Sequence, residues 1–306
     1  MELVVSIIVG MMLAATPLLF AATGELVVER SGVLNLGVEG MMIAGAVAGF
    51  VTTATTGSHL AGILAAIGAG AALALLHGLM TQVLLANQVA SGLALTIFGL
   101  GLSALAGQGF SGMSIPPLAR LDLPLLSDIP FLGPLLFRHE PLFYLSLALL
   151  GGVAWFLTRS RAGMILRAVG ENHDAAHAIG FPVVRIRMAA LAFGGALAGL
   201  GGAHLSIART PLWSEGMTAG RGWIALAIVV FAGWRAGRTL FGAYLFGGVT
   251  ILQLHVQGLG VAIPAQYLSM LPYLATILVL VLISVDSSRQ VLRAPGSLGR
   301  TFHATS

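Results

Sequence analysis

The sequence contains neither cysteine nor lysine, and only 8% of its residues are charged. The absence of cysteine excludes disulfides, thiol nucleophiles and Cys-ligated metals. The absence of lysine excludes a Gly-x-x-x-x-Gly-Lys-Ser/Thr phosphate loop, so the chain has no P-loop site for ATP hydrolysis. Its histidines and acidic residues form no catalytic or metal-ligating constellation within the apolar segments. We therefore expect a protein that is not an enzyme, has no metal site and binds no cofactor of its own.

What the sequence has instead is long apolar runs. Hydrophobic residues make up 57% of the chain, and its mean hydropathy is +0.96. Residues 40–119 and 239–285 contain no Asp, Glu, Lys or Arg. A helix needs about 20 apolar residues to cross a bilayer, and the bilayer core offers no water to an unpaired backbone. The sequence predicts an all-α polytopic integral membrane protein with about 8–10 transmembrane or re-entrant helices.

Polar punctuation divides the chain into apolar segments, and we expect one transmembrane permease domain over residues 1–306. No basic residue precedes the first segment, which favours a retained membrane helix over a signal peptide. Two segments, 34–51 and 222–234, are short or begin in polar sequence, which is typical of broken or re-entrant helices. The predicted segments are 3–20, 34–51, 60–85, 89–106, 141–157, 188–207, 222–234, 239–257 and 267–284.

The distribution of arginine predicts the orientation. The loop 158–187 contains five arginines against two acidic residues, and the tail 286–306 is also basic. The loop 107–140 has more acidic than basic residues. The positive-inside rule therefore places 158–187 and 286–306 in the cytoplasm and 107–140 outside. Because the arginines lie at the ends of predicted spans, we interpret them as topology signals and expect no nucleic-acid partner.

The loop 158–187 also contains signals for a short helix. Asn172 is a good N-cap, Gly180 suits the position after the C-terminus, and Pro182 prevents continuation. These residues predict a two-turn helix from Asn172 to Ile179, with Ala175, Ala176 and Ile179 on one face.

A face of small residues can seat in a groove of another protein, so partner docking is one interpretation of this helix. A plain surface helix is the other. The pattern Ala-Ala-x-x-x-Gly also occurs at Ala65–Gly70 and Ala189–Gly194, inside apolar spans where close helix packing explains it. Only its position in the charged loop gives this copy functional weight.

Ionisable and amide groups flank the second segment, where Glu29, Asn35 and Glu39 lie in or near apolar sequence. Ionisable groups in a membrane usually pair or line a water-filled path. Asn35 and Glu39 lie four residues apart, so a structural hydrogen-bonded pair is as plausible as a pathway lined by these side chains. An ordinary interfacial loop is the third interpretation.

A second polar cluster stands between two apolar segments. Asn87, Gln88 and Ser91 carry uncharged amides and a hydroxyl, which can bind a base or a ribose without the cost of burying a charge. Such residues also bridge helices or finish helix ends. The candidate substrate-path residues are Glu29, Asn35, Glu39, Asn87, Gln88 and Ser91.

Three stretches resemble a known family. Residues 24–46 (GELVVERSGVLNLGVEGMMIAGA), 166–180 (LRAVGENHDAAHAIG) and 214–234 (SEGMTAGRGWIALAIVVFAGW) are similar, in the same order, to permease subunits of ABC importers. The branch is that of nucleoside and simple-sugar permeases, related to the ribose and branched-chain amino-acid permeases. The resemblance implies a cargo such as a nucleoside or related purine, with a sugar or an amino acid as alternatives.

The resemblance also implies a role for the loop helix. In these permeases a Glu-Ala-Ala-x-x-x-Gly motif forms a coupling helix that docks on the ATPase subunit. Here Asp174 replaces the glutamate, Ala175, Ala176 and Gly180 are in register, and Glu171 belongs to the same loop.

The implied partners are ATP-binding subunits that consume the ATP, a second and different permease subunit, an external solute-binding protein and the lipid bilayer. The implied location is a bacterial plasma (inner) membrane. A secondary transporter or channel for a small polar solute is the alternative, and the charge-free runs argue against proton coupling in it.

Overall fold

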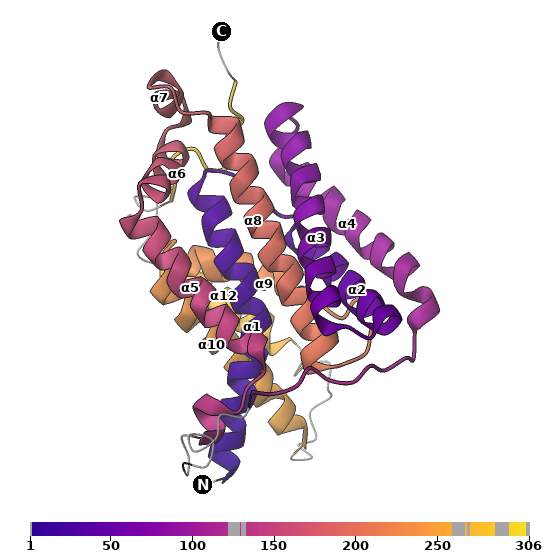
Figure 1. Ribbon diagram of the computed structural model, residues 1–306. Coiled ribbons are helices and arrows are strands. Elements are labelled where there is room, and N and C mark those ends of the chain that lie inside the picture. The colour runs from indigo at the N-terminus through magenta and orange to yellow at the C-terminus, as the bar shows by residue number, and fades with distance from the viewer. Residues whose placement is uncertain are drawn as a thin grey trace.

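The computed structural model describes residues 2–121, 129, 133–258, 267, 270–284 and 294–303, and it is a bundle of helices (Figure 1). Within these residues no β-strand forms, and an isolated bridge joins Ser114 to Leu212. The all-α prediction is confirmed. The α-helices are α1 (Glu2–Arg30), α2 (Val38–Thr56), α3 (His59–Gly78), α4 (Gln88–Gly107), α5 (Pro141–Arg159), α6 (Arg161–Glu171), α7 (His173–Ala178), α8 (Val183–Ala203), α9 (Arg221–Phe231), α10 (Ala236–Gly258) and α12 (Leu271–Ser284).

Seven helices of the described chain are long and apolar enough to cross a membrane. They are α1, α2, α5, α10, α3 with its π-helical extension η1 (Leu79–Val83), α4 with η2 (Gln108–Phe110), and α8 with the π-helical η4 (His204–Arg209). Two further apolar helices, α9 with 11 residues and α12 with 14, are shorter. The polytopic prediction is therefore confirmed, and the shortness of α9 agrees with the reading of 222–234 as a broken or re-entrant helix.

The first helix is longer than predicted. It continues past residue 20 to Arg30, so Glu25 and Glu29 lie on a buried helical turn rather than in an interfacial loop. The helix can pass through Gly24 because this residue packs directly on α8, where a Cβ atom would lie 2.7 Å from the carbonyl oxygen of Gly194. The interfacial-loop interpretation is therefore wrong for Glu25 and Glu29, whereas residues 31–37 are non-helical.

Glycines bring the central helices into close contact. A Cβ atom on Gly199 of α8 would lie 2.1 Å from the carbonyl oxygen of Ala66 on α3, and one on Gly45 of α2 would lie 2.4 Å from the Cα of Gly199. Small residues at such crossings let membrane helices approach closely enough for van der Waals packing to hold them together. The glycine-rich stretch of α8 thus sets the distance between α2, α3 and α8.

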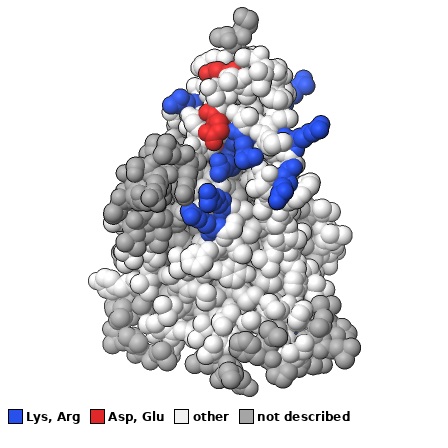
Figure 2. Space-filling view, turned by 90° about the vertical axis from the view of Figure 1, so that its left-hand side faces the viewer, with Lys and Arg blue, Asp and Glu red and all other residues white. Residues whose placement is uncertain are grey.

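The ends of the bundle differ in character. The helices α6 and α7 lie at the same end as the C-terminal segment 294–303, and the N-terminal end of α1 lies at the other (Figure 1). We call the first end the α7 end. On the face drawn in Figure 2, arginine side chains gather toward the α7 end and the remaining described surface is almost free of charge.

Candidate functional site

The predicted loop helix is present. It is α7 (His173–Ala178), with Asn172 as the N-cap and Ile179 as the C-cap. The side-chain oxygen of Asn172 accepts a hydrogen bond of 3.0 Å from the backbone N–H of Ala175. Gly180 follows with φ of +94°, a left-handed conformation that glycine adopts without steric cost. The predicted bounds and both capping signals are confirmed.

The predicted single face of α7 is wrong for one residue. Ala176 is buried and packs with Val169, Val183 and Phe302. Ala175 and Ile179 are exposed, and Ile179 has 72% of its surface accessible. Ala176 turns inward because the C-terminal segment, which carries Phe302, covers that side of the helix. The outward surface of α7 therefore consists of Asp174, Ala175, His177, Ala178 and the C-cap Ile179.

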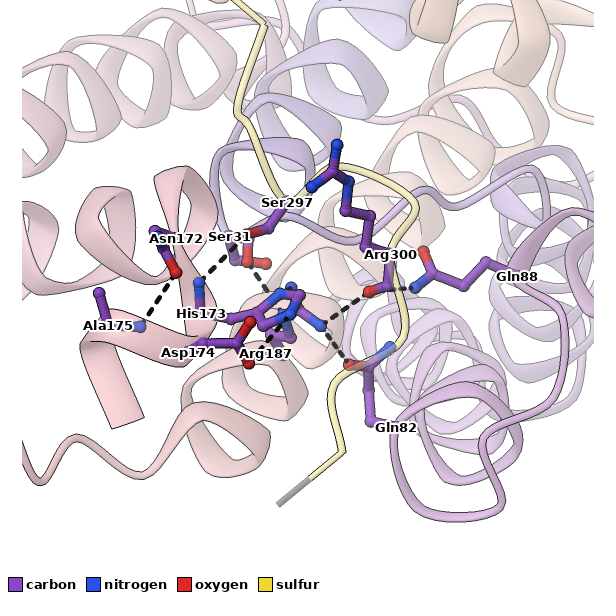
Figure 3. A network of polar contacts seen from close by, with 10 residues as sticks. All are labelled: Ser31, Gln82, Gln88, Asn172, His173, Asp174, Ala175, Arg187, Ser297 and Arg300. Carbon is purple, nitrogen blue, oxygen red and sulfur yellow. Dashed lines mark hydrogen bonds and ion pairs between the residues drawn. The ribbon is translucent and has the colours of Figure 1, made fainter. Parts of the chain in front are cut away.

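A buried arginine joins α7 to the bundle (Figure 3). Arg187 of α8 is fully buried, and its Nη2 atom contacts Nδ1 of His173 at 3.0 Å. Its Nη1 atom donates at 3.2 Å to Oε1 of Gln82 and to the carbonyl oxygen of Arg300, and its Nε atom donates at 3.2 Å to the carbonyl oxygen of Ser31. A buried charge is costly unless its hydrogen bonds are made. Here one guanidinium holds four chain segments together.

The sequence did not predict this role of Arg187. It placed the residue at the end of the polar loop 158–187. A signal was available, because Arg185 and Arg187 lie two residues apart. On a helix with 3.6 residues per turn, two such residues point in nearly opposite directions. One of the pair had to face the bundle, and Arg185 is the exposed one.

The C-terminal segment 294–303 forms part of the same network. The hydroxyl of Ser297 accepts from the backbone N–H of His173 at 3.1 Å, and the Ser297 N–H donates to the carbonyl oxygen of Gly170 at 2.8 Å. The ring of Phe302 lies 5.4 Å from that of His173 and 5.2 Å from that of His177, centre to centre. The segment thus lies against α6 and α7 and fixes their position. Within the predicted tail 286–306, residues 286–293 and 304–306 lie outside the described residues.

The protonation of His173 follows from its neighbours. A guanidinium has donors only, so Nδ1 of His173 must be the acceptor from Arg187, and the ring proton is then on Nε2. That atom faces Oδ1 of Asp174 at 3.5 Å. Burial and the positive charge of Arg187 lower the pKa of His173, while Asp174 opposes the shift. The imidazole is therefore neutral at neutral pH.

The carboxylates near α7 remain accessible. Glu171 lies at the end of α6 with 58% of its side chain exposed, and its Oε1 atom is 3.9 Å from Nη1 of Arg30. Its Oε2 atom accepts a long hydrogen bond of 3.4 Å from the Gly296 N–H. The side chain of Asp174 is 78% exposed. Both acidic groups can meet a partner at the surface of the α7 end.

Of the predicted substrate-path residues, Glu39 accepts the most hydrogen bonds. Its carboxylate is buried and accepts from the hydroxyl of Thr218 at 2.6 Å, from the N–H of Gly220 at 2.9 Å and from the N–H of Gly222 at 2.6 Å. Gly220 and Gly222 stand at the start of α9, where free backbone N–H groups attract a negative charge. Glu39 therefore anchors the beginning of α9 to α2.

Asn35 and Glu39 are not paired with each other. Asn35 lies in the non-helical segment before α2, so the spacing of four residues does not place the two on one helical face. Its amide donates to Oε2 of Glu25 at 3.1 Å, and its side-chain oxygen accepts from the N–H of Gly37 at 3.1 Å. Asn35 thus joins the start of α2 to α1.

Glu29 and Arg30 hold the turn between α9 and α10. Oε2 of Glu29 accepts from Nε1 of Trp234 at 2.5 Å, and the guanidinium of Arg30 donates to the Trp234 carbonyl oxygen at 2.9 and 3.2 Å. Trp234 has φ of +54°, an uncommon conformation for a bulky residue. The C-terminal end of α1 therefore holds this turn through both the side chain and the carbonyl group of Trp234.

The second polar cluster is split between two elements of structure. Asn87 is the N-cap of α4 and accepts from the N–H of Ala90 at 3.0 Å. Gln88 accepts from the Leu34 N–H at 2.8 Å and donates to the Arg300 carbonyl oxygen at 3.3 Å, so it shares that acceptor with Arg187. Ser91 is buried on α4. The structure thus brings Gln88 into the Arg187 network and leaves Asn87 at a helix end.

These features define a membrane-embedded helical subunit with a short exposed helix fixed to one end of its bundle. The family model described as branched-chain amino acid transport system / permease component matches residues 7–281. The chain belongs to this family and is a permease subunit of an ABC transporter.

Named relatives align along almost the whole chain. The chain is 42% identical over 312 residues to a putative glucose ABC transporter permease protein, TsgC13, of Haloferax volcanii, with 95% of each protein covered. It is 33% identical over 290 residues to the nucleoside ABC transporter permease protein NupC of Lactococcus lactis, with 90% of this chain and 91% of the relative covered. It is also 33% identical over 294 residues to the guanosine ABC transporter permease protein NupQ of Bacillus subtilis, with 90% and 92% covered.

Proposed function

We propose that this chain forms the membrane path of an ATP-driven importer for a small solute that carries a hydroxylated ring, either a nucleoside or a sugar. Two of the relatives above are named for nucleosides or guanosine and one for glucose. A ribose and a hexose share several ring hydroxyls, which is the chemistry common to these cargoes. The proposal covers both and prefers a nucleoside or related purine.

The observation that carries the proposal is the fixation of α7. An exposed helix whose base is held by Arg187 cannot move independently of the residues that Arg187 contacts. These include Gln82, which follows α3, and Ser31, which follows α1. A force applied to the outward surface of α7 is therefore transmitted to the ends of two membrane helices.

The energy enters from other subunits, because the chain has no lysine and hence no phosphate loop. In our account Glu171, Asp174, Ala175, Ala176 and Gly180 form the coupling region, in which Ala176 supports the helix from inside and the others meet the ATPase. The arginine-rich α7 end then faces the cytoplasm. A second, different permease subunit and an external solute-binding protein complete the importer, which we place in the plasma membrane, the inner one where a cell has two.

An exposed alanine tests the docking surface. We expect Ala175→Trp to abolish ATP-driven uptake and co-purification of the ATPase, because the indole occupies the space that the partner needs. Ala168→Trp, at an exposed alanine on α6, is the matched control and should retain both. Gly180→Trp should also abolish both, although no atom lies within 4 Å of a Cβ built there, because the indole blocks the partner and because the φ of +94° at residue 180 strains any side chain other than glycine. Full uptake by both variants would contradict the docking role.

A further inference from the structure

A cavity lies between the middle of the bundle and the end opposite α7. It has a volume of about 520 Å³, which falls in the range of pockets for small ligands. Its walls come from α1, the end of α8 with η4, the beginning of α9, α10 and α12. The α1 wall is apolar and consists of Ala14, Pro17 and Leu18. None of the six predicted substrate-path residues lines this cavity.

Two arginines face the cavity, Arg209 at the end of η4 and Arg221 at the start of α9. The charge of Arg221 is repelled by Arg209 and attracted by the carboxylate of Glu39. One nitrogen of Arg221 is occupied, since Nη1 donates to the carbonyl oxygens of Met217 and Thr218 at 2.7 and 3.2 Å. In the described part of the chain no hydrogen-bond acceptor reaches the Arg209 guanidinium. Within the described residues the Arg209 guanidinium therefore makes no hydrogen bond, and the carboxylate of Glu140 attracts its charge from nearby.

The other polar groups of the cavity can both donate and accept. Tyr273 donates its hydroxyl proton to the Ala219 carbonyl oxygen at 2.8 Å, which leaves its oxygen as an acceptor. Thr250 likewise donates to the Phe246 carbonyl oxygen at 3.0 Å and retains an acceptor. Gln253 contributes an amide with both functions. Arginines alone would suit an anion, whereas this mixture suits hydroxyl groups, which need donors and acceptors together.

We infer that this cavity is a binding site for the transported solute, with the ring hydroxyls and carbonyl groups of the solute toward Arg209, Arg221 and Gln253 and its apolar face against α1. The inference rests on the proposed function. Charged side chains within a membrane are costly and mark solute pathways when they face a cavity. Binding of a hydroxylated solute supplies the Arg209 guanidinium with hydrogen-bond acceptors that the described residues do not provide.

Glu39 fixes the backbone that carries part of this site but does not line the cavity itself. Its carboxylate holds Thr218, Gly220 and Gly222, which flank Arg221 and the strained Ala219, whose φ is +47°. Glu39, which the sequence predicted as a substrate-path residue, therefore shapes one wall of the cavity without facing it.

The absence of cysteine makes a labelling test direct. The test uses the assembled transporter in vesicles, with Gln253→Cys in the cavity and Leu252→Cys, which is 59% exposed on the same helix and does not line the cavity, as the control. A membrane-impermeant methanethiosulfonate reagent should modify Gln253→Cys, and saturating guanosine or glucose should slow the reaction at least about threefold, since bound solute blocks access. Leu252→Cys should remain unlabelled with or without solute, because a side chain exposed on a membrane-spanning helix outside the cavity faces lipid and not water. No labelling of Gln253→Cys, or a rate unaffected by both solutes, would overturn the inference.

Uptake kinetics give the second measurement. Arg209→Gln should raise the KM for uptake about tenfold, which corresponds to about 1.4 kcal/mol and is typical of a lost charge-assisted hydrogen bond. Arg209→Lys should recover part of the loss, and Arg238→Gln, at an exposed arginine of α10 outside the cavity, should leave the KM unchanged. Without ATP-driven uptake by the wild-type assembly, the proposed function fails. With wild-type uptake and an unchanged KM in Arg209→Gln, only the inference about the cavity fails.

Discussion

Nη2 of Arg187 lies 3.0 Å from Nδ1 of His173, and this contact joins a membrane helix to the short helix α7 outside it. Both groups are buried, and each has further partners in other segments of the chain. The position of α7 is therefore determined by the bundle. If α7 receives force from an ATPase, as we propose, Arg187 is the residue through which the force reaches α1 and η1.

Removal of the Arg187 guanidinium should loosen this connection. We expect Arg187→Met to lower the free energy of unfolding by about 1–3 kcal/mol, because it leaves buried hydrogen-bond acceptors unpaired. Thermal unfolding of the purified protein in detergent measures the change. Arg185→Met, at the exposed neighbour, should shift the midpoint by much less. Equal midpoints for the two variants would contradict the assignment of Arg187 as the central group.

Acid should weaken the same contact. The folded-state pKa of His173 is lowered by burial and by Arg187, whereas the unfolded value is about 6.5. The unfolded chain therefore binds this proton more readily, and the contribution of His173 to stability is complete above about pH 6.5 and declines as the pH falls below it. We expect His173→Gln, whose side-chain oxygen can also accept from Arg187, to show a weaker loss of stability between about pH 6.5 and 5. His177→Gln, at an exposed histidine of the same helix, provides the control, and identical pH profiles for both variants would refute the assignment.

The C-terminal segment should affect coupling more than insertion. Phe302 packs on Ala176 and Val183, and replacement of a buried phenylalanine by alanine typically costs about 3–5 kcal/mol. Because the lost contacts are confined to the α7 end, we expect Phe302→Ala to increase hydrogen exchange in α7 and to raise the ATP consumed per solute transported. His303→Ala should change neither quantity. Unaltered exchange in α7 would show that the segment does not fix the helix.

Glu39 should be required for the structure around α9. Glu39→Gln keeps one acceptor oxygen but loses the charge that the start of α9 attracts, so we expect a destabilisation of about 1–3 kcal/mol. Glu39→Ala should cost more. Thermal unfolding checks the order, with Glu2→Gln near the N-terminus as a control for the removal of one acidic charge. A Glu39→Ala variant as stable as the wild type would rule out the anchoring role.

Much of the fold follows from hydropathy, because a membrane helix is defined by its own residues. The predicted segments 89–106 and 141–157 agree with α4 and α5 within two residues at each end. The capping signals of α7 were also local, since Asn172 bonds to Ala175, three residues away.

The rest depends on residues distant in sequence. The burial of Glu29 requires Trp234, and the burial of Arg187 requires Gln82 and Arg300. No local sequence pattern predicts such distant partners. For the same reason the sequence predicted Glu39 as a substrate-path residue and did not single out Arg209, which faces the cavity whose wall Glu39 supports.

The central claim is that the chain moves solute only when a separate ATPase acts on it. The direct measurement is accumulation of labelled guanosine or glucose in proteoliposomes that contain this permease and its partner permease, with the solute-binding protein supplied outside. We predict accumulation against a gradient only when the ATPase subunits and ATP are also present. Accumulation by this chain alone, without ATP, would contradict the account and identify a secondary transporter.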